Sequence, residues 1–167
     1  ISLEKNGDVS LGTFKDGYLW NGNHLFDKGH IFTGELNIND WKGGNISGSL
    51  KVTHQDGTFY EGECVHGKPH GQGTYELLDG SKFSGEWNYG VLHGRGISIE
   101  PNGVMDVGQF KDGILWKGTH IFPNGEKFVG EWKNGLEWNI DYFDKRGDFI
   151  GQIYKNGEFP IGNDLKV

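Results

Sequence analysis

The sequence predicts an all-β fold, an antiparallel meander of about seven hairpin repeats in a single layer. Three observations predict it: glycines recur about every 22 residues, aromatic residues flank them, and Asn-Gly or Asp-Gly pairs separate the segments between them. A repeat this regular is a stronger signal than any single residue. The anchor glycines are Gly12, Gly34, Gly62, Gly85, Gly108, Gly130 and Gly151.

Each repeat contains two short strands. The clearest repeats, Phe59–Ser81 and Lys82–Gly103, hold two alternating segments that a glycine-containing turn divides and Asp-Gly or Asn-Gly closes. These dipeptides supply the positive φ angles that tight antiparallel turns need. We therefore expect strands of about six residues, and no stretch has a helical period of useful length.

The first strand of a repeat follows the pattern aromatic–x–Gly–x–aromatic. With a strand period of two, these residues share one face, where the glycine leaves room for large rings. The residue after the anchor glycine is acidic or amide in most repeats, which predicts that the opposite face is wet and acidic. These residues are Glu35, Glu63, Glu86, Gln109, Glu131 and Gln152.

The repeats fall into two subtypes. One carries His-Gly-x-Gly at 70–73 and 93–96, and the other carries Leu-Trp-x-Gly-x-His at 19–24 and 115–120. Trp138 keeps only the tryptophan of the second subtype. Residues 2–26 and 98–122 align without gaps with 14 of 25 identical, so we expect the chain to begin inside a repeat.

We assign residues 1–157 to the repeat array, and 158–167 to a C-terminal cap or linker, because the pattern fails there. The second repeat is longer than the others between Gly34 and Gly44. We expect the extra residues to form a loop around Asn39–Trp41.

The segments Tyr60–Gly73, Phe83–Gly96 and Phe128–Gly135 resemble the MORN (membrane occupation and recognition nexus) repeat. They follow its pattern of an aromatic residue, Gly-Glu and a later glycine, and the first two also carry His-Gly-x-Gly. The resemblance implies an elongated, twisted half-pipe. It also implies a binding or scaffold module, often beside cytoskeletal or membrane machinery, and sometimes the arm of a lipid kinase or a lysine methyltransferase.

The charge and the cysteine content of the chain argue against some classes of function. The net charge of −7 and the absence of a basic cluster argue against nucleic-acid binding, and they give membrane association little support. The single cysteine, Cys64, permits no internal disulfide and fits a reducing compartment. We expect a cytoplasmic protein, and the resemblance adds association with the cytoskeleton or with membranes.

No motif for catalysis stands apart from the repeat. Gly62 to Lys68 resembles a phosphate-binding loop, but Pro69 replaces the Ser or Thr that would bind magnesium. His66 and His70 lie on a turn without a third metal ligand, and the glutamates belong to the solvated face. We expect no enzymatic activity, no cofactor and no metal.

The aromatic stripe is the candidate binding surface, although core packing is the more common role of any single ring. We expect it to bind an apolar or amphipathic partner segment with basic flanks. The alternatives are a targeting arm of a larger enzyme, a phosphoinositide-binding module, and a homodimer through a sheet edge or the C-terminal end. The candidate residues are Tyr60, Phe83, Trp87, Phe110, Phe128, Trp132, Trp116 and Trp138.

Overall fold

The computed structural model describes residues 1–3, 5, 8–16, 18–25, 31–35 and 47–154. The chain forms two compact units, residues 1–91 and 92–167, and each is described by itself. The predicted loop around Asn39–Trp41 and the predicted cap at 158–167 lie outside the described residues.

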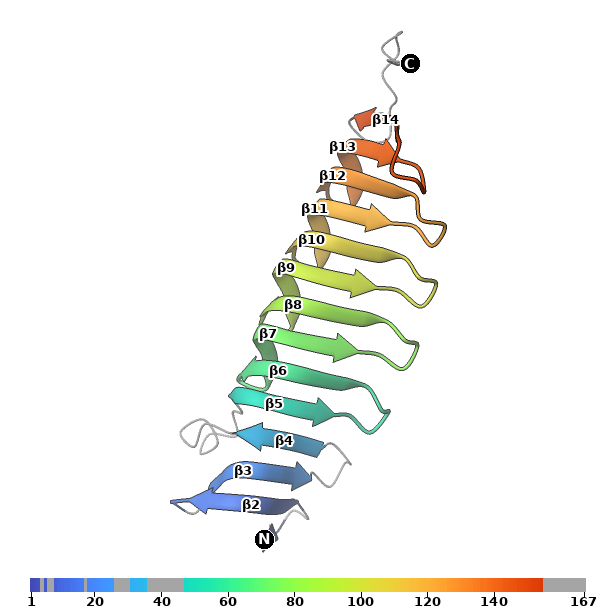
Figure 1. Ribbon diagram of the computed structural model, residues 1–167. Coiled ribbons are helices and arrows are strands. Elements are labelled where there is room, and N and C mark those ends of the chain that lie inside the picture. The colour runs from blue at the N-terminus through green and yellow to red at the C-terminus, as the bar shows by residue number, and fades with distance from the viewer. Residues whose placement is uncertain (4, 6–7, 17, 26–30, 36–46, 155–167) are drawn as a thin grey trace. The chain divides into compact units, whose positions relative to one another are not determined.

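The first unit is a meander of antiparallel strands (Figure 1). Each strand from β1 to β8 pairs with the next one in the chain. The strands are β1 (Ser2–Leu3), β2 (Val9–Lys15), β3 (Tyr18–Leu25), β4 (Ile31–Glu35), β5 (Gly48–Thr53), β6 (Phe59–Val65), β7 (Lys68–Glu76) and β8 (Lys82–Asn88).

The second unit continues the same pattern. Its strands are β9 (Val91–Ile99), β10 (Met105–Lys111), β11 (Ile114–Ile121), β12 (Lys127–Lys133), β13 (Leu136–Phe143) and β14 (Phe149–Tyr154). Each pairs antiparallel with the next, and no described strand closes either sheet into a barrel. The predicted all-β meander of hairpin repeats is confirmed.

The first strand has the register that the internal sequence alignment predicts. Ser2 pairs with Ser10, as Ser98 pairs with Asp106 in the aligned segment. The aligned segment 98–99 lies in β9, the second strand of its own repeat, and the start of the chain inside a repeat stays a prediction.

The hairpin turns are of two kinds. In the first, both central residues have positive φ, as in Asp112-Gly113 and Asn134-Gly135, which fits the predicted tight turns. His66-Gly67 and Tyr89-Gly90 form the same turn without Asp or Asn.

The second kind of turn uses Asp or Asn in another way. In the turn from Leu77 to Ser81, only Gly80 has positive φ, and its N–H donates to the Leu77 carbonyl at 3.0 Å. The Asp79 carboxylate accepts the Ser81 N–H at 2.8 Å. Asn102 and Asn124 accept an N–H two residues on in the same way.

Glycines face one another across neighbouring strands, as at Gly108 and Gly118. A Cβ added to Gly108 would lie 2.6 Å from the Gly118 Cα, and its φ of 158° also favours glycine. Close approach of two backbones therefore requires these glycines. The predicted room for a ring is found at the anchor Gly62, where an added Cβ would lie 2.6 Å from Tyr60 Oη, and also at Gly73 on the neighbouring strand, where it would lie 2.5 Å from Tyr60 Cζ.

The core lies on the face that carries the anchor glycines, here called the aromatic face. Its buried apolar residues are Leu19, Val52, Tyr60, Cys64 and Trp87 in the first unit, and Leu92, Phe110, Leu115, Trp132, Ile140 and Ile153 in the second. The rings pack edge to face, with Tyr60 and Trp87 centroids 5.9 Å apart.

Candidate functional site

The structure separates the predicted binding residues by burial. Tyr60, Trp87, Phe110 and Trp132 are buried in the aromatic face. Phe83, Phe128 and Trp138 are half-buried, and Trp116 is 52 % exposed. A partner can reach Trp116 without disturbing the core, so that ring is the best-placed candidate, and partner binding by the whole set stays a prediction.

Burial keeps the titratable groups near Tyr60 in their protonated forms. The Tyr60 hydroxyl donates to the Glu63 carbonyl at 2.7 Å, and burial raises the pKa of Tyr60, so the hydroxyl stays a donor. Burial also raises the pKa of the Cys64 thiol to about 11. Cys64 is therefore a small buried apolar residue and not an activated nucleophile.

The tryptophans of the second subtype share one structural position. Gln109 pairs with Lys117 and Phe110 with Leu115, so Trp116 is the extra residue of a β-bulge. Trp20 is the extra residue between Leu19 and Asn21, and Trp138 between Glu137 and Asn139. A bulge redirects the strand and its side chain, which explains how an aromatic residue next to the core reaches the surface.

Two of these tryptophans line a cavity with a volume of about 540 Å³, here called the tip cavity. It lies between the tips of two successive hairpins. Hairpin β10–β11 contributes Lys111, Asp112, Ile114, Leu115 and Trp116, and hairpin β12–β13 contributes Glu131, Trp132, Lys133, Asn134, Gly135 and Trp138.

The tip cavity opens where strand pairing stops. Strands β11 and β12 pair from Ile121↔Lys127 as far as Lys117↔Glu131 and no further. The side chains of this last residue pair form an ion pair, with Lys117 Nζ 3.0 Å from Glu131 Oε1. The tips beyond it are held by their own turns, and the bulge tryptophans lie in the space between them.

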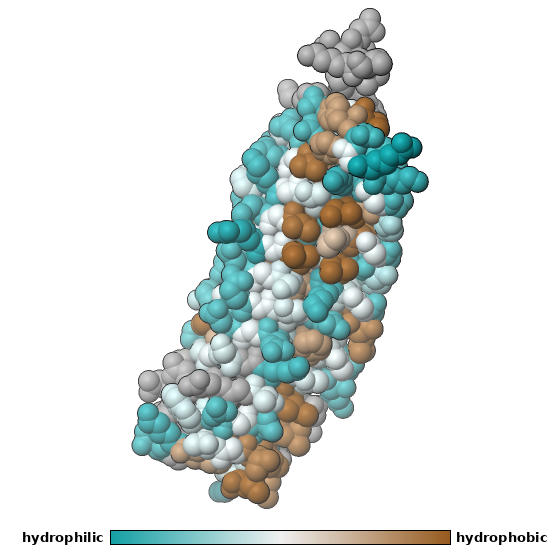
Figure 2. Space-filling view, in the orientation of Figure 1, coloured by the Kyte–Doolittle hydropathy of each residue, from teal (hydrophilic) through white to brown (hydrophobic). Residues whose placement is uncertain are grey.

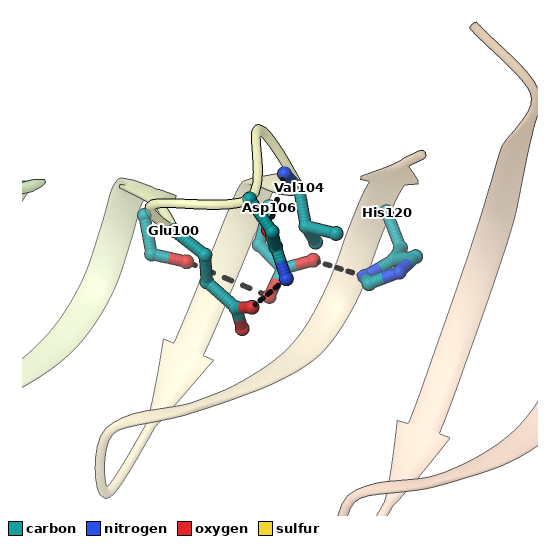
Figure 3. Close-up of polar contacts among 6 residues, drawn as sticks. Glu100, Val104, Asp106 and His120 are labelled. Carbon is teal, nitrogen blue, oxygen red and sulfur yellow. Dashed lines mark hydrogen bonds and ion pairs between the residues drawn. The ribbon is translucent and has the colours of Figure 1, made fainter. Parts of the chain in front are cut away.

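Histidine forms polar pairs on the aromatic face. In Figure 3, His120 of β11 points toward Asp106 of β10, with Nδ1 2.6 Å from Oδ1. The other carboxylate oxygen accepts the Ser98 hydroxyl at 3.5 Å. Asp106 stands where most repeats carry an aromatic residue, so a polar pair here replaces a pair of rings.

The first unit has the equivalent pair, and it resembles a serine-protease triad. The Ser10 Oγ lies 2.7 Å from His24 Nδ1, and Asp8 Oδ2 lies 3.6 Å from His24 Nε2. Catalysis would need a serine that a substrate can reach. Ser10 is only 2 % exposed and His24 only 1 %, so this cluster stabilises the sheet.

The sequence predicts hydrogen bonds from His70 and His93 to turn backbone. For His93 this is right, because its Nδ1 accepts the Asp112 N–H at 3.4 Å. For His70 it is wrong, because its buried Nδ1 has no hydrogen-bond partner in the described structure. The His70 ring lies 4.8 Å from the Tyr89 ring instead, where aromatic contact replaces the hydrogen bond.

The sequence predicts that the face opposite the aromatic face is wet and acidic, and this is right only in part. Glu63 and Gln109 are exposed as expected. Two further rows on strands β9–β12 are apolar or β-branched, and Figure 2 shows the brown patch over these strands. We call this the opposite-face patch; it consists of Ile97, Ile99, Met105, Val107, Thr119, Ile121 and Val129.

The opposite-face patch could have been found from the alternation of these residues, because they recur with a period of two on four strands. The polar residue after most anchor glycines masks these apolar rows in the sequence. The tip cavity could not have been found in this way, since it depends on how two hairpin tips lie relative to each other.

Among the described residues, no group of His, Cys, Asp and Glu side chains could hold a metal ion. The described part of the chain also contains no helix long and apolar enough to span a bilayer.

A family model described as the MORN repeat matches residues 60–82, 83–105 and 128–138. No curated protein matches the chain significantly. MORN repeats are in general non-catalytic modules for interaction with proteins or membranes. The matches, together with the antiparallel meander of hairpins, show that the chain contains MORN repeats.

Proposed function

We propose that this protein is a non-enzymatic interaction scaffold whose tip cavity accepts an apolar side chain of a partner protein. The observation that carries the proposal is Trp116, half exposed beside an open cavity of about 540 Å³. Exposed tryptophan at a concave site is typical of binding surfaces, because its large ring gives much contact area at little entropic cost.

The partner segment is apolar or amphipathic. Trp116, Leu115 and Trp138 line the cavity and suit an apolar anchor. The net charge of −7 attracts basic flanks over longer distances and raises the association rate. A cytoplasmic location belongs to the same proposal, since Cys64 is a free thiol.

A photo-crosslinking amino acid in place of Trp116 tests the proposal in the native source. The matched control places the same amino acid at Leu78, an exposed apolar residue of the first unit. We expect one partner segment, identified by mass spectrometry, to crosslink at position 116 and not at 78.

A second measurement uses substitution. Trp116→Ala should abolish recovery of the partner so identified, and Leu78→Ala should leave it intact. Circular dichroism should show unchanged folding in both, because each side chain is largely exposed. Equal recovery by the wild type and Trp116→Ala would refute the tip cavity as the binding site.

A further inference from the structure

The turn glycine at the tip cavity differs from the turn glycines of two other hairpins in the hydrogen bond that its N–H makes. At two other turns, the glycine N–H donates to the preceding hairpin, from Gly90 to the Pro69 carbonyl at 2.8 Å and from Gly113 to the Leu92 carbonyl at 3.0 Å. Among the described residues, Gly135 makes no such backbone hydrogen bond. Gly135 lines the tip cavity, and its N–H has no backbone acceptor in the hairpin before it.

The difference follows the repeat subtype. The hairpins that accept these two bonds carry His-Gly-x-Gly, whereas the hairpin before Gly135 carries Trp116 at its bulge. The nearest atom to a Cβ placed on Gly135 is Ile114 Cγ2, at 4.0 Å. The two tips are therefore neighbours without a backbone hydrogen bond at this glycine, and the cavity lies between them.

The charges around the cavity differ from those of the chain. Two lysines and two carboxylates line it, so the formal charge of the lining is 2 − 2 = 0, within a chain of −7. One of the two carboxylates, Glu131, is already paired at 3.0 Å with Lys117, which lies outside the lining. In the described structure neither Lys111 nor Lys133 has a carboxylate within 4.0 Å.

The remaining carboxylate lies toward the preceding hairpin. Asp112 Oδ1 is 3.6 Å from His93 Nδ1, and that nitrogen accepts the Asp112 N–H at 3.4 Å. Lys133 is held over the Trp138 ring, with Nζ 4.3 Å from the centroid, so its ammonium group stands beside the apolar lining.

From these contacts we propose that the tip cavity recognises an acidic peptide motif, an apolar side chain with Asp or Glu next to it. The apolar side chain lies among Trp116, Leu115 and Trp138. The carboxylate is bound by Lys111 and Lys133, and the Gly135 N–H supplies a third donor. The inference rests on the proposed function and adds the charge of the residue beside the anchor, while basic flanks further away meet the acidic remainder of the surface.

The test selects a displayed library of random peptides on the immobilised full chain, with counter-selection on Trp116→Ala. Peptides dependent on Trp116 should carry Trp, Phe or Leu with a neighbouring Asp or Glu. The affinity of the best peptide is then measured by fluorescence anisotropy for the wild type and for Lys111→Gln/Lys133→Gln. The double variant should bind about tenfold more weakly, as expected for a lost charged hydrogen bond.

Two controls test whether the loss of affinity is specific to the lysines of the tip cavity and to the carboxylate of the peptide. Lys15→Gln should leave the affinity unchanged, because Lys15 lies over Trp20 in the first unit, 5.0 Å from the ring centroid, outside the tip cavity. Replacing the acid of the peptide by its amide should weaken binding to the wild type and have little further effect on the double variant.

The other possible results refute either the acidic motif alone or the proposed function as well. Trp116-dependent peptides with only Lys or Arg beside the anchor, or affinities that the lysine substitutions leave unchanged, refute the acidic motif and leave the proposed function standing. An absence of Trp116-dependent peptides refutes both. Lysine-dependent flotation with phosphoinositide-containing phosphatidylcholine vesicles, without peptide enrichment, would assign the cavity to a lipid headgroup and refute the peptide motif.

Discussion

Single glycines and the rings beside them set the local geometry of this sheet. Gly73 and Gly151 look alike in the sequence, since both stand in the glycine pattern of the repeats. Their surroundings differ: a Cβ on Gly73 would meet the buried Tyr60 ring, whereas a Cβ on Gly151 would meet nothing within 4 Å. The alternation of residues predicts where a glycine stands, but only the packed structure tells which one has no room for a methyl group.

Gly73→Ala should therefore destabilise the fold, by about 1–3 kcal/mol or more, because the Tyr60 ring cannot move without disturbing its hydrogen bond to Glu63. Gly151→Ala is the matched control and should leave stability unchanged or raise it slightly. Urea unfolding followed by circular dichroism measures both. Equal effects of the two substitutions would contradict the steric explanation.

Hairpin turns and bulges are the elements that give the repeats their individual character. Asp-Gly and Asn-Gly pairs predict turns correctly, yet the same dipeptide serves two geometries that differ in the φ of its first residue. Asp112 adopts positive φ, whereas Asp79 caps a backbone N–H with its carboxylate. The number of residues between paired strands decides between them, so sequence identity at the turn is not enough.

The capping carboxylates make these turns sensitive to acid. Hydrogen bonds from the Ser81 backbone and hydroxyl lower the pKa of Asp79 from its ordinary value of 3.8, and those from Thr58 do the same for Asp56. Because the folded pKa is the lower one, the stabilisation is complete above the unfolded pKa and is lost as the pH falls through the folded value.

The double variant Asp56→Asn/Asp79→Asn should keep the turns, because the side-chain oxygens of Asn102 and Asn124 already accept the equivalent backbone N–H in this chain. The double variant should lose less stability than the wild type between about pH 4 and pH 2. Thermal melts across this pH range measure the difference. Identical pH dependence of the two proteins would show that these carboxylates do not contribute.

The strands of the second unit carry the opposite-face patch, which no described segment covers. Ile97→Thr/Val107→Thr keeps β-branching and should change stability by less than about 1 kcal/mol. It should lower the fluorescence of a bound hydrophobic dye such as ANS, because the dye binds exposed apolar surface. Leu11→Thr, in the first unit, is the control, and an equal decrease there would mean that the patch is not the main dye site.

At the scale of the molecule, each strand contacts mainly its neighbours in the chain. Stability in such an array is close to a sum of repeat terms and nearest-neighbour terms. Damage to one repeat should therefore remain local, in contrast to a closed globular core.

Hydrogen exchange on Gly73→Ala tests this expectation. Amide exchange should become faster in β6–β8 and remain as slow as in the wild type in β12 and β13, because those strands belong to the other compact unit. Faster exchange in all strands would show that the chain unfolds as one cooperative unit.

The sequence by itself determined the strand order, the hairpin repeat and the aromatic face. Local rules suffice there, since residue alternation, turn dipeptides and glycine spacing act within one hairpin. The tertiary structure decided which rings are buried, as at Trp132, and which are open, as at Trp116. It also decided that a bulge tryptophan accompanies an open space between two tips, because that space depends on contacts between hairpins, which no single repeat specifies.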